Sequence, residues 1–281
     1  MTTRLPQACV RALTPVVGAS SAELAVARLY AVIYLVFYYV SAHYARALLG
    51  IVWLVLTPVL FLAVYVPVLT HVFHGELPGS TSPYDYALFI VTGFLPWGAF
   101  SDGFSQGAAS VATNPGVVRH APIPPSFLPL IRVSASFTGL LVGVVILLPV
   151  LAALGRFPGA RLVLFPAAFL LLYVFTLGVS WLASSVAVFV RDVLQLIPTL
   201  LLIEFFACPV VYHPSLAKGL LDTFIQWNPM TPFLALFRAS LAPTAEFAWG
   251  DLGCAALWAL IALVSGLATF KKYEGDFGDA L

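Results

Sequence analysis

Charged residues are rare in this 281-residue sequence. Asp, Glu, Lys and Arg together make up 9% of the chain, whereas hydrophobic residues make up 61%. Soluble domains contain about 25% charged and about 45–50% apolar residues, so the composition excludes an ordinary soluble protein. Several apolar runs also exceed the ~18 residues that indicate a transmembrane helix. The sequence therefore predicts an integral membrane protein.

The features of nucleic-acid-binding proteins are missing too. The formal net charge is only +1, and the sequence has no basic arm and no basic patch with interleaved aromatic residues. We therefore expect membrane lipids, and no nucleic acid, as surroundings of this chain.

Cysteine is scarce, and catalytic motifs are missing. Cys9, Cys208 and Cys254 stand far apart and show no metal-binding spacing. A Cys208–Cys254 disulfide and a role as small core residues both remain open. A phosphate-binding loop requires Gly-Lys-Ser/Thr, and none of the three lysines is followed by Ser or Thr. We therefore expect no catalytic residues, no metal, no cofactor and no ATPase activity in this chain.

Six hydrophobic segments are long enough to cross about 30 Å of hydrocarbon. They cover residues 51–73, 87–111, 127–154, 162–190, 193–213 and 248–270. Arg191 and Asp192 separate the fourth and fifth segments, and two adjacent charges favour a turn at the membrane surface. The predicted fold is all-α and integral to the membrane. It has six transmembrane helices within residues 50–281, after a cytoplasmic N-terminal region over residues 1–49.

Residues 24–44 are apolar but have two distinct faces. An aliphatic stripe lies opposite a stripe formed by Tyr30, Tyr34 and Tyr38, which is typical of an amphipathic helix at the membrane interface. If this helix lies flat, nine Lys and Arg residues fall on the cytoplasmic side and four outside; if it spans, the division is seven to six. The positive-inside bias favours the flat helix and places both termini in the cytoplasm.

Two short amphipathic segments, 215–226 and 231–241, follow the fifth span. Each is too short to cross a membrane, so we interpret both as re-entrant or interfacial. The intervening "WNPMTP" ends one helix and begins the next, with Thr231 as the expected N-cap. The sequence therefore predicts a re-entrant helical hairpin at the outer side, between spans five and six.

The stretch "TNPGVVRHAPIPPSF", residues 113–127, interrupts the apolar pattern between spans two and three. Its four prolines prevent a continuous helix, and Arg119 and His120 keep it in water or against a polar surface. A stiff, cationic connection at the cytoplasmic end fits a surface on which a partner protein pushes. A rigid loop with positive-inside residues is the alternative, and composition leaves both open.

Two acidic residues, Asp102 and Glu204, fall within predicted spans. An ionised carboxylate in hydrocarbon costs about 3 kcal/mol on insertion scales, so each should face a partner or a wet cavity. Asp102 lies in a polar, glycine-rich stretch that favours the lining of a water-filled path. Glu204 fits either such a path, a proton relay or a structural polar network.

Five stretches occur in an order that resembles a known family: "ARALLGIVWLVLTPVL", "YALFIVTGFLPWGAF", "FVRDVLQLIPTLL", "FFACPVVYH" and "WNPMTPFLALFRASL". This order, from about residue 45 to 241, resembles the membrane (permease) subunit of type-2 ABC exporters. It is most similar to the permeases that export O-antigen and related cell-surface polysaccharides. One stretch departs from the family, because its charged Arg-Glu-x-x-x-Arg-Tyr pattern is reduced here to His43 and Arg46 in "FYYVSAHYARALLG".

The resemblance implies roles for the matching positions. Contact with a separate ATPase, through a coupling helix in 113–126 and the turn after the fourth span, is implied for Asn114, Pro115, Arg119, His120, Arg191 and Asp192. An outer gate is implied for Pro209, Tyr212, Trp227, Asn228, Pro229 and Arg238. The start of the first span, where a substrate gains access, matches at Arg46, Gly50, Trp53 and Pro58. For the translocation path we name Gly93, Trp97, Asp102 and Glu204.

The resemblance also implies a function. Two copies of the chain form a homodimeric channel, and two copies of an ABC ATPase bind ATP and magnesium. The expected substrate is an undecaprenyl-linked glycan, which moves from the cytoplasmic side across the bacterial inner membrane. A teichoic acid or a hydrophobic drug is the alternative cargo. A flippase driven by protons through Asp102 and Glu204 is the alternative mechanism.

Overall fold

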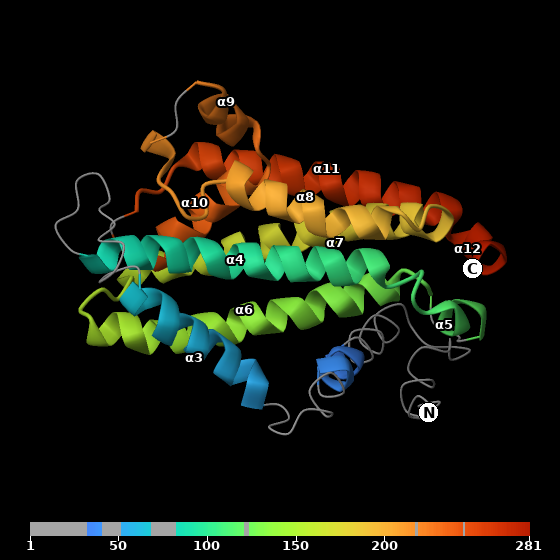
Figure 1. Ribbon diagram of the computed structural model, residues 1–281, viewed down its shortest axis with the longest axis horizontal. Coiled ribbons are helices and arrows are strands. Elements are labelled where there is room, and N and C mark those ends of the chain that lie inside the picture. The colour runs from blue at the N-terminus through green and yellow to red at the C-terminus, as the bar shows by residue number, and fades with distance from the viewer. Residues whose placement is uncertain (1–32, 41–51, 69–82, 121–123, 217–218, 244) are drawn as a thin grey trace, which may run out of the picture.

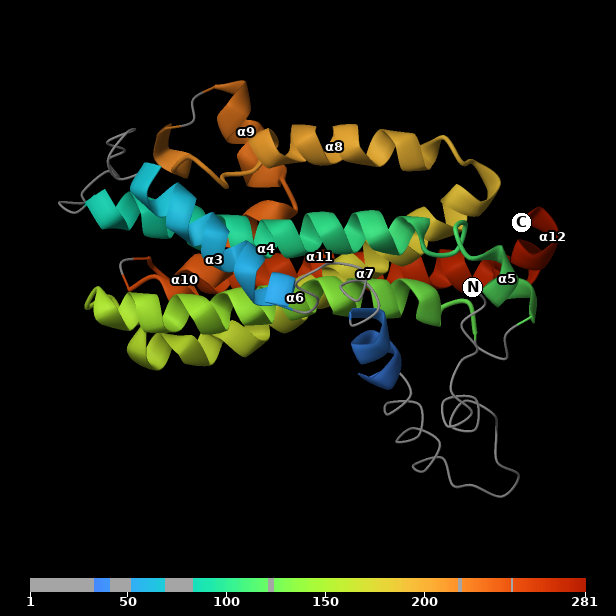
Figure 2. The same cartoon turned by 60° about the horizontal axis from the view of Figure 1, so that its bottom comes forward.

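The computed structural model describes residues 33–40, 52–68, 83–120, 124–216, 219–243 and 245–281. Every regular element within these ranges is a helix, as the predicted all-α class requires. The longer helices lie side by side along one axis and form an elongated bundle (Figures 1 and 2).

Among the described residues, four helices are long and apolar enough to cross a membrane. They are α4 (Pro83–Ala109), α6 (Phe127–Ala153), α7 (Phe165–Phe189) and α11 (Trp249–Tyr273). A short 3₁₀ helix, η2 (Gly159–Leu164), precedes α7 directly. These helices correspond to the second, third, fourth and sixth predicted spans, in agreement with a multi-pass membrane protein.

Helices α7 and α11 touch backbone to backbone in the middle of the bundle. A Cβ atom on Gly266 would lie 2.0 Å from the Gly178 carbonyl oxygen, and one on Gly178 would lie 2.3 Å from the Ala262 carbonyl carbon. In a lipid bilayer, helices gain little free energy by burying apolar surface against each other. They associate through van der Waals contacts, and small residues such as glycine allow the backbones to approach closely enough for these. Glycine is therefore required on both helices.

The first and fifth predicted spans are shorter in the structure. Helix α3 (Val52–Pro67) has 16 residues and α8 (Val193–Ala207) has 15, whereas a transmembrane helix needs about 20. The sequence placed these spans at 51–73 and 193–213. Residues 209–213, which follow α8, are not helical, and residues 69–73 lie outside the described part of the chain. Six spans therefore remain a prediction.

The segments after α8 differ in detail from the predicted hairpin. A 3₁₀ turn, η3 (Pro214–Leu216), precedes α9 (Leu220–Trp227). The prediction of a single helix over 215–226 was therefore wrong. Helix α10 (Met230–Leu241) begins before Thr231, so the prediction of Thr231 as its N-cap was wrong. The Thr231 hydroxyl instead donates a hydrogen bond to the Ile225 carbonyl (2.8 Å). Every residue of α10 except Thr231 and Ala235 is buried, because α10 packs against α4, α7 and α11.

The predicted interruption at the prolines is confirmed. Helix α4 ends at Ala109, a separate short helix α5 (Pro115–His120) follows, and α6 begins at Phe127. Pro115 opens α5, where a missing N–H costs nothing. The chain ends in a 3₁₀ turn, η4 (Glu274–Asp276), and α12 (Phe277–Ala280), which lie beside α5 at one end of the bundle (Figure 1).

Part of the predicted interfacial segment 24–44 is described. Residues 33–40 are helical. The guanidinium carbon of Arg132, on α6, lies 4.0 Å from the centroid of the Tyr39 ring, and its Nη1 donates a hydrogen bond to the Tyr39 hydroxyl. The helix is thereby fixed against α6. The rest of the predicted region 1–49 lies outside the described residues.

Candidate functional site

Arg238 lies at the centre of a junction between α4, α8 and α10. Its side chain, from α10, is only 6% exposed. The Nη2 atom donates to the carbonyl oxygens of Pro209 (2.6 Å) and Val210 (3.0 Å), and Nε donates to that of Phe89 (3.3 Å). The guanidinium carbon also lies 3.6 Å from the centroid of the Phe89 ring. Arg238 therefore links α10 to α4 and to the chain that follows α8.

The guanidinium occupies space that Gly93 leaves open. A Cβ on this buried residue of α4 would lie 2.5 Å from Nη2 of Arg238 and 3.1 Å from the Val210 oxygen. Within the described ranges no carboxylate forms an ion pair with Arg238, whose hydrogen bonds go to backbone carbonyls. Such carbonyls satisfy a buried charge without a second charged group.

Asn228 connects α10 to Glu204. Its Oδ1 atom accepts a hydrogen bond from the Met230 backbone N–H (2.7 Å) and so caps the start of α10. Its side chain also lies near the Glu204 carboxyl group on α8. Glu204 Oε1 is buried and has no hydrogen-bond partner among the described residues. The acidic residue inside a predicted span thus lies beside a polar side chain.

The loop after α8 completes this junction. The Tyr212 hydroxyl donates to the Phe206 carbonyl (2.9 Å) and so closes the loop onto the end of α8. The His213 ring lies 5.6 Å from the Phe89 ring. Burial, and in second place the positive charge of Arg238, lower the pKa of His213, which favours its neutral form.

An aromatic contact joins α4 to α8 next to the junction. The Trp97 ring packs edge-to-face on Phe205 with centroids 4.7 Å apart, and Phe94 approaches the same ring at 6.3 Å. The Trp97 Nε1 atom is buried and lacks a hydrogen-bond partner in the described chain. We call the set Gly93, Trp97, Glu204, Pro209, Asn228 and Arg238 the α4–α8–α10 junction. It unites residues predicted separately for a path and for a gate.

Three predicted path and gate residues lie away from the junction or at its margin. Asp102 is exposed and accepts a hydrogen bond from Ser136 of α6, so it lies on a different side of α4 from Gly93 and Trp97. Trp227 is 77% exposed and does not contribute to the buried set. Pro229 is half-buried at the start of α10.

The predicted coupling residues gather at the opposite end of the bundle. The Asn114 side-chain amide donates to the Ser110 carbonyl (2.7 Å) and so ties the start of α5 to the end of α4. Arg119 is exposed, and its Nε donates to the Gly278 carbonyl of α12 (3.1 Å). His120 is exposed on α5, and Arg191 and Asp192 are exposed in the turn between α7 and α8.

The predicted access residues are only partly described. Arg46 and Gly50 lie outside the described residues. Trp53 is exposed on α3, and Pro58 falls within the same helix.

Comparison with models of known protein families gives no match. Curated relatives, in contrast, match nearly the whole chain. The O-antigen export system permease protein RfbA of Myxococcus xanthus is 28% identical over 247 residues, which cover 86% of this chain and 91% of the relative. RfbA of Klebsiella pneumoniae is 23% identical, with the same coverage. The polysialic acid transport protein KpsM of Escherichia coli is 23% identical over 84% of this chain and 90% of the relative.

The chain is a homologue of type-2 ABC exporter permeases. The resemblance drawn from the five stretches is thereby confirmed. Two of the permease motifs, the Gly93–Trp97 stretch and the Asn228–Arg238 stretch, belong to separate helices that meet in the α4–α8–α10 junction.

Sequence reasoning missed three contacts of this permease homologue. Asp85 and Arg156 form an ion pair (2.9 Å) that joins the start of α4 to the loop after α6. Ser136 binds Asp102, and Phe277 is fully buried beside α5. No periodicity or local motif relates the members of these pairs, because they are distant in the sequence.

Proposed function

We propose that this chain is the membrane channel subunit of an ATP-driven exporter. It moves a lipid-linked polysaccharide of the O-antigen type from the cytoplasmic side across the bacterial inner membrane, and a separate nucleotide-binding subunit supplies the energy. The similarity to O-antigen export permeases over 86% of the chain carries this proposal.

In the proposed topology α3 and α8 also cross the membrane, which gives six spans with both termini in the cytoplasm. The distribution of cations supports this orientation. Arg119 on α5, Arg191 after α7, and Lys271 and Lys272 at the end of α11 all belong to the end of the bundle that carries α12. The positive-inside bias assigns that end to the cytoplasm.

In the proposed assembly two copies of the chain form the channel, and we place their contact along α8. One stripe of this helix, formed by Leu196, Leu200 and Ile203, is exposed, whereas Ile197 and Leu201 face the bundle. The exposed stripe offers a second copy an apolar surface next to the α4–α8–α10 junction. The re-entrant character of α9 and α10 belongs to the same proposal.

The proposed coupling begins where the ATPase, with ATP and magnesium bound, closes against α5 and the Arg191–Asp192 turn. Asn114 ties α5 to α4, so a push on α5 displaces α4 along its axis. Gly93 lies about 24 Å from the end of that helix at 1.5 Å per residue. The displacement therefore shifts Gly93 relative to Arg238. This shift weakens the contact of Arg238, on α10, with α4 and opens the outer gate.

The proton-driven alternative receives less support from the geometry. Asp102 accepts a hydrogen bond from Ser136 of α6, whereas Glu204 lies on α8 near Asn228, so the two acids have different neighbours. No observation favours teichoic acid or a drug over an O-antigen type of polysaccharide.

The test is co-expression of this chain with the ATPase subunit of an ABC-type polysaccharide exporter. We expect the two proteins to co-purify and to export a lipid-linked glycan into the lumen of inverted vesicles when ATP is added. A variant of the ATPase without its phosphate-binding lysine serves as the control and should abolish export. Export by this chain alone, without any ATPase, would contradict the proposal.

A further inference from the structure

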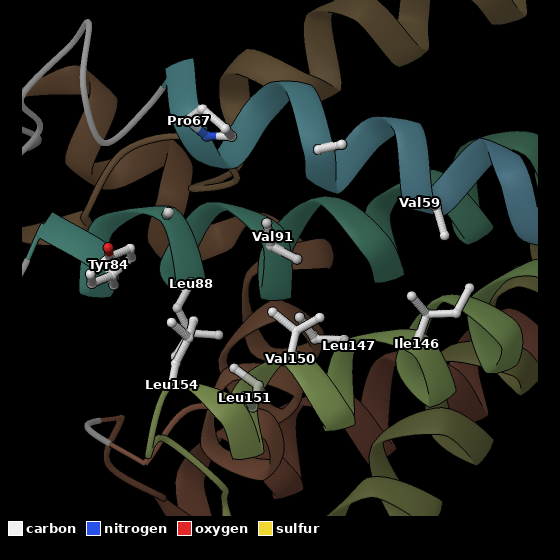
Figure 3. A pocket seen from close by; sticks show the side chains of 12 residues that line it. Val59, Pro67, Tyr84, Leu88, Val91, Ile146, Leu147, Val150, Leu151 and Leu154 are labelled. Carbon is white, nitrogen blue, oxygen red and sulfur yellow. The ribbon is translucent and has the colours of Figure 1, made fainter.

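A cavity of about 360 Å³ lies in a groove between α3, α4 and α6 (Figure 3). Twelve side chains of the described residues line it, and among these twelve the Tyr84 hydroxyl is the only polar group. Figure 3 shows Tyr84, Leu88 and Leu154 at one end of the groove and Val59 and Ile146 at the other. An apolar lining of this kind favours hydrocarbon over water.

The groove opens sideways from the bundle. Leu88, Val91 and Leu147 form a buried floor, whereas Tyr84 and Val150 at the rim are exposed. Along α6 the lining extends from Ile146 to Leu154, or about 12 Å at 1.5 Å per residue. The groove lies on a different side of α4 from Gly93 and Trp97, which contact α10 and α8. It is therefore separate from the α4–α8–α10 junction.

One end of the groove carries a guanidinium. Arg156 follows Leu154 closely, and its Nη1 lies 2.9 Å from Oδ1 of Asp85, the neighbour of Tyr84. The Arg156 side chain is still 30% exposed. An arginine has five N–H donors in a planar fork that matches phosphate, so donors remain beyond the Asp85 bond.

We propose that this groove binds one acyl chain of a membrane phospholipid whose phosphate contacts Arg156. The polar end next to a long apolar groove matches the shape and the charge of such a lipid, and the sideways opening admits it from the bilayer. In the proposed topology the loop with Arg156 lies outside, so the lipid belongs to the outer leaflet. The site holds α3 against the α4–α6 pair.

Native mass spectrometry of the protein, released from nanodiscs of phosphatidylethanolamine and phosphatidylglycerol, tests this site. We expect the wild type to retain one phospholipid per chain. Val150→Trp fills the groove and should lose that lipid. Val145→Trp is the matched control, because Val145 is 66% exposed on the same helix but does not line the groove. Arg156→Gln should weaken retention of phospholipid but not of diacylglycerol.

Three outcomes would overturn the site. Equal retention by the two tryptophan variants would show that the groove holds no lipid. Displacement of the bound lipid by undecaprenyl phosphate, but not by added phospholipid, would assign the groove to the carrier of the glycan. A disulfide between two copies carrying Val150→Cys would assign it to an interface of the dimer.

A second, independent feature is the contact between α5 and the C-terminal segment. Phe277 is fully buried, with its ring centroid 5.1 Å from that of Phe270 and 6.2 Å from that of Phe189. Val111, at the end of α4, and Val118, on α5, pack in the same cluster. Together with the bond from Arg119 to the Gly278 carbonyl, this cluster fixes one side of α5.

We infer that residues 277–281 position α5 for its contact with the ATPase. This inference rests on the proposed function, because it assigns to the C-terminal segment the support against which the ATPase pushes. Arg119 then has a structural bond within the chain in addition to its charge. Phe277 is a positioning residue, since it acts on the ATPase contact only through α5.

Hydrogen exchange of residues 115–120 in the isolated chain tests the positioning without any transport. Phe277→Ala should speed exchange there, whereas Asp279→Ala, an exposed change in the same helix, should not. In the complete exporter Phe277→Ala should lower the glycan exported per ATP hydrolysed. Unchanged exchange would overturn the positioning role, whatever the function. Faster exchange in Phe277→Ala, together with no ATP-dependent export by the wild-type exporter, would instead contradict the proposed function and leave the positioning of α5 standing.

Discussion

The guanidinium of Arg238 fills the position at which a side chain on Gly93 would begin. A Cβ on Gly93 would lie 2.5 Å from Nη2, and that same nitrogen donates to the Pro209 and Val210 carbonyls. The missing side chain of one residue therefore permits the hydrogen bonds of the other. Because Gly93 lies on α4 and Arg238 on α10, the pair sets the spacing of two helices.

Gly93→Ala is expected to destabilise the protein by about 1–3 kcal/mol, because the new methyl group pushes the guanidinium away from its carbonyls. Thermal unfolding of the purified protein in detergent measures this effect. Gly98→Ala on the same helix is the control, since its Cβ would meet no atom within 4 Å. It should be neutral or stabilising by about 0.5–1 kcal/mol. Equal losses for the two variants would contradict the close contact.

Arg238→Met should cost more than Arg238→Lys. Methionine removes the Arg238 donor from the buried carbonyls of Pro209 and Val210, and each unsatisfied group costs about 1–3 kcal/mol, whereas the Phe89 carbonyl still accepts from Thr92. Lysine keeps the charge, but one ammonium cannot follow the fork that reaches α4 and the loop after α8. Arg161→Met is the matched control, because Arg161 also donates to two carbonyls, those of Pro243 and Ala245, but is exposed. A midpoint of unfolding that is equally low for Arg161→Met would contradict this account.

Gly266→Ala is expected to be the most damaging of the glycine changes. Its Cβ would lie 2.0 Å from a backbone oxygen of α7, which cannot rotate away as a side chain does. Helices α7 and α11 must separate, at a cost of about 3 kcal/mol or more. The amount of monodisperse protein in detergent reports this loss. Gly253→Ala, on the same helix in open space, should leave that amount unchanged.

Glu204→Gln distinguishes a structural role from proton transport. The amide is isosteric with the carboxyl group and remains a polar neighbour of Asn228, so we expect normal folding and normal ATP-dependent export. Glu204→Leu should lower the midpoint of unfolding, because Asn228 then loses its polar neighbour at the start of α10. Complete loss of export in Glu204→Gln, with normal folding, would favour the proton-driven mechanism.

Much of the site followed from local patterns. The prolines of 113–127 fix a break whatever surrounds them, and the structure has a separate α5 there. Arg191 and Asp192 are an exposed turn, as two adjacent charges require. Asn228 and Arg238 were identified through their family motif. That motif did not reveal that the Arg238 guanidinium binds carbonyls after α8 and fills the space beside Gly93.

The sequence by itself determined that this is a membrane protein, where its long helices lie and where the chain must turn, because those properties depend on composition, length and proline. The tertiary structure decided which apolar face is core and which meets lipid. In a soluble helix polar residues mark the outer face, but in a chain with 61% hydrophobic residues both faces are apolar. The burial of α10, the separation of Asp102 from Gly93 and the ion pair of Asp85 with Arg156 therefore required the packed structure.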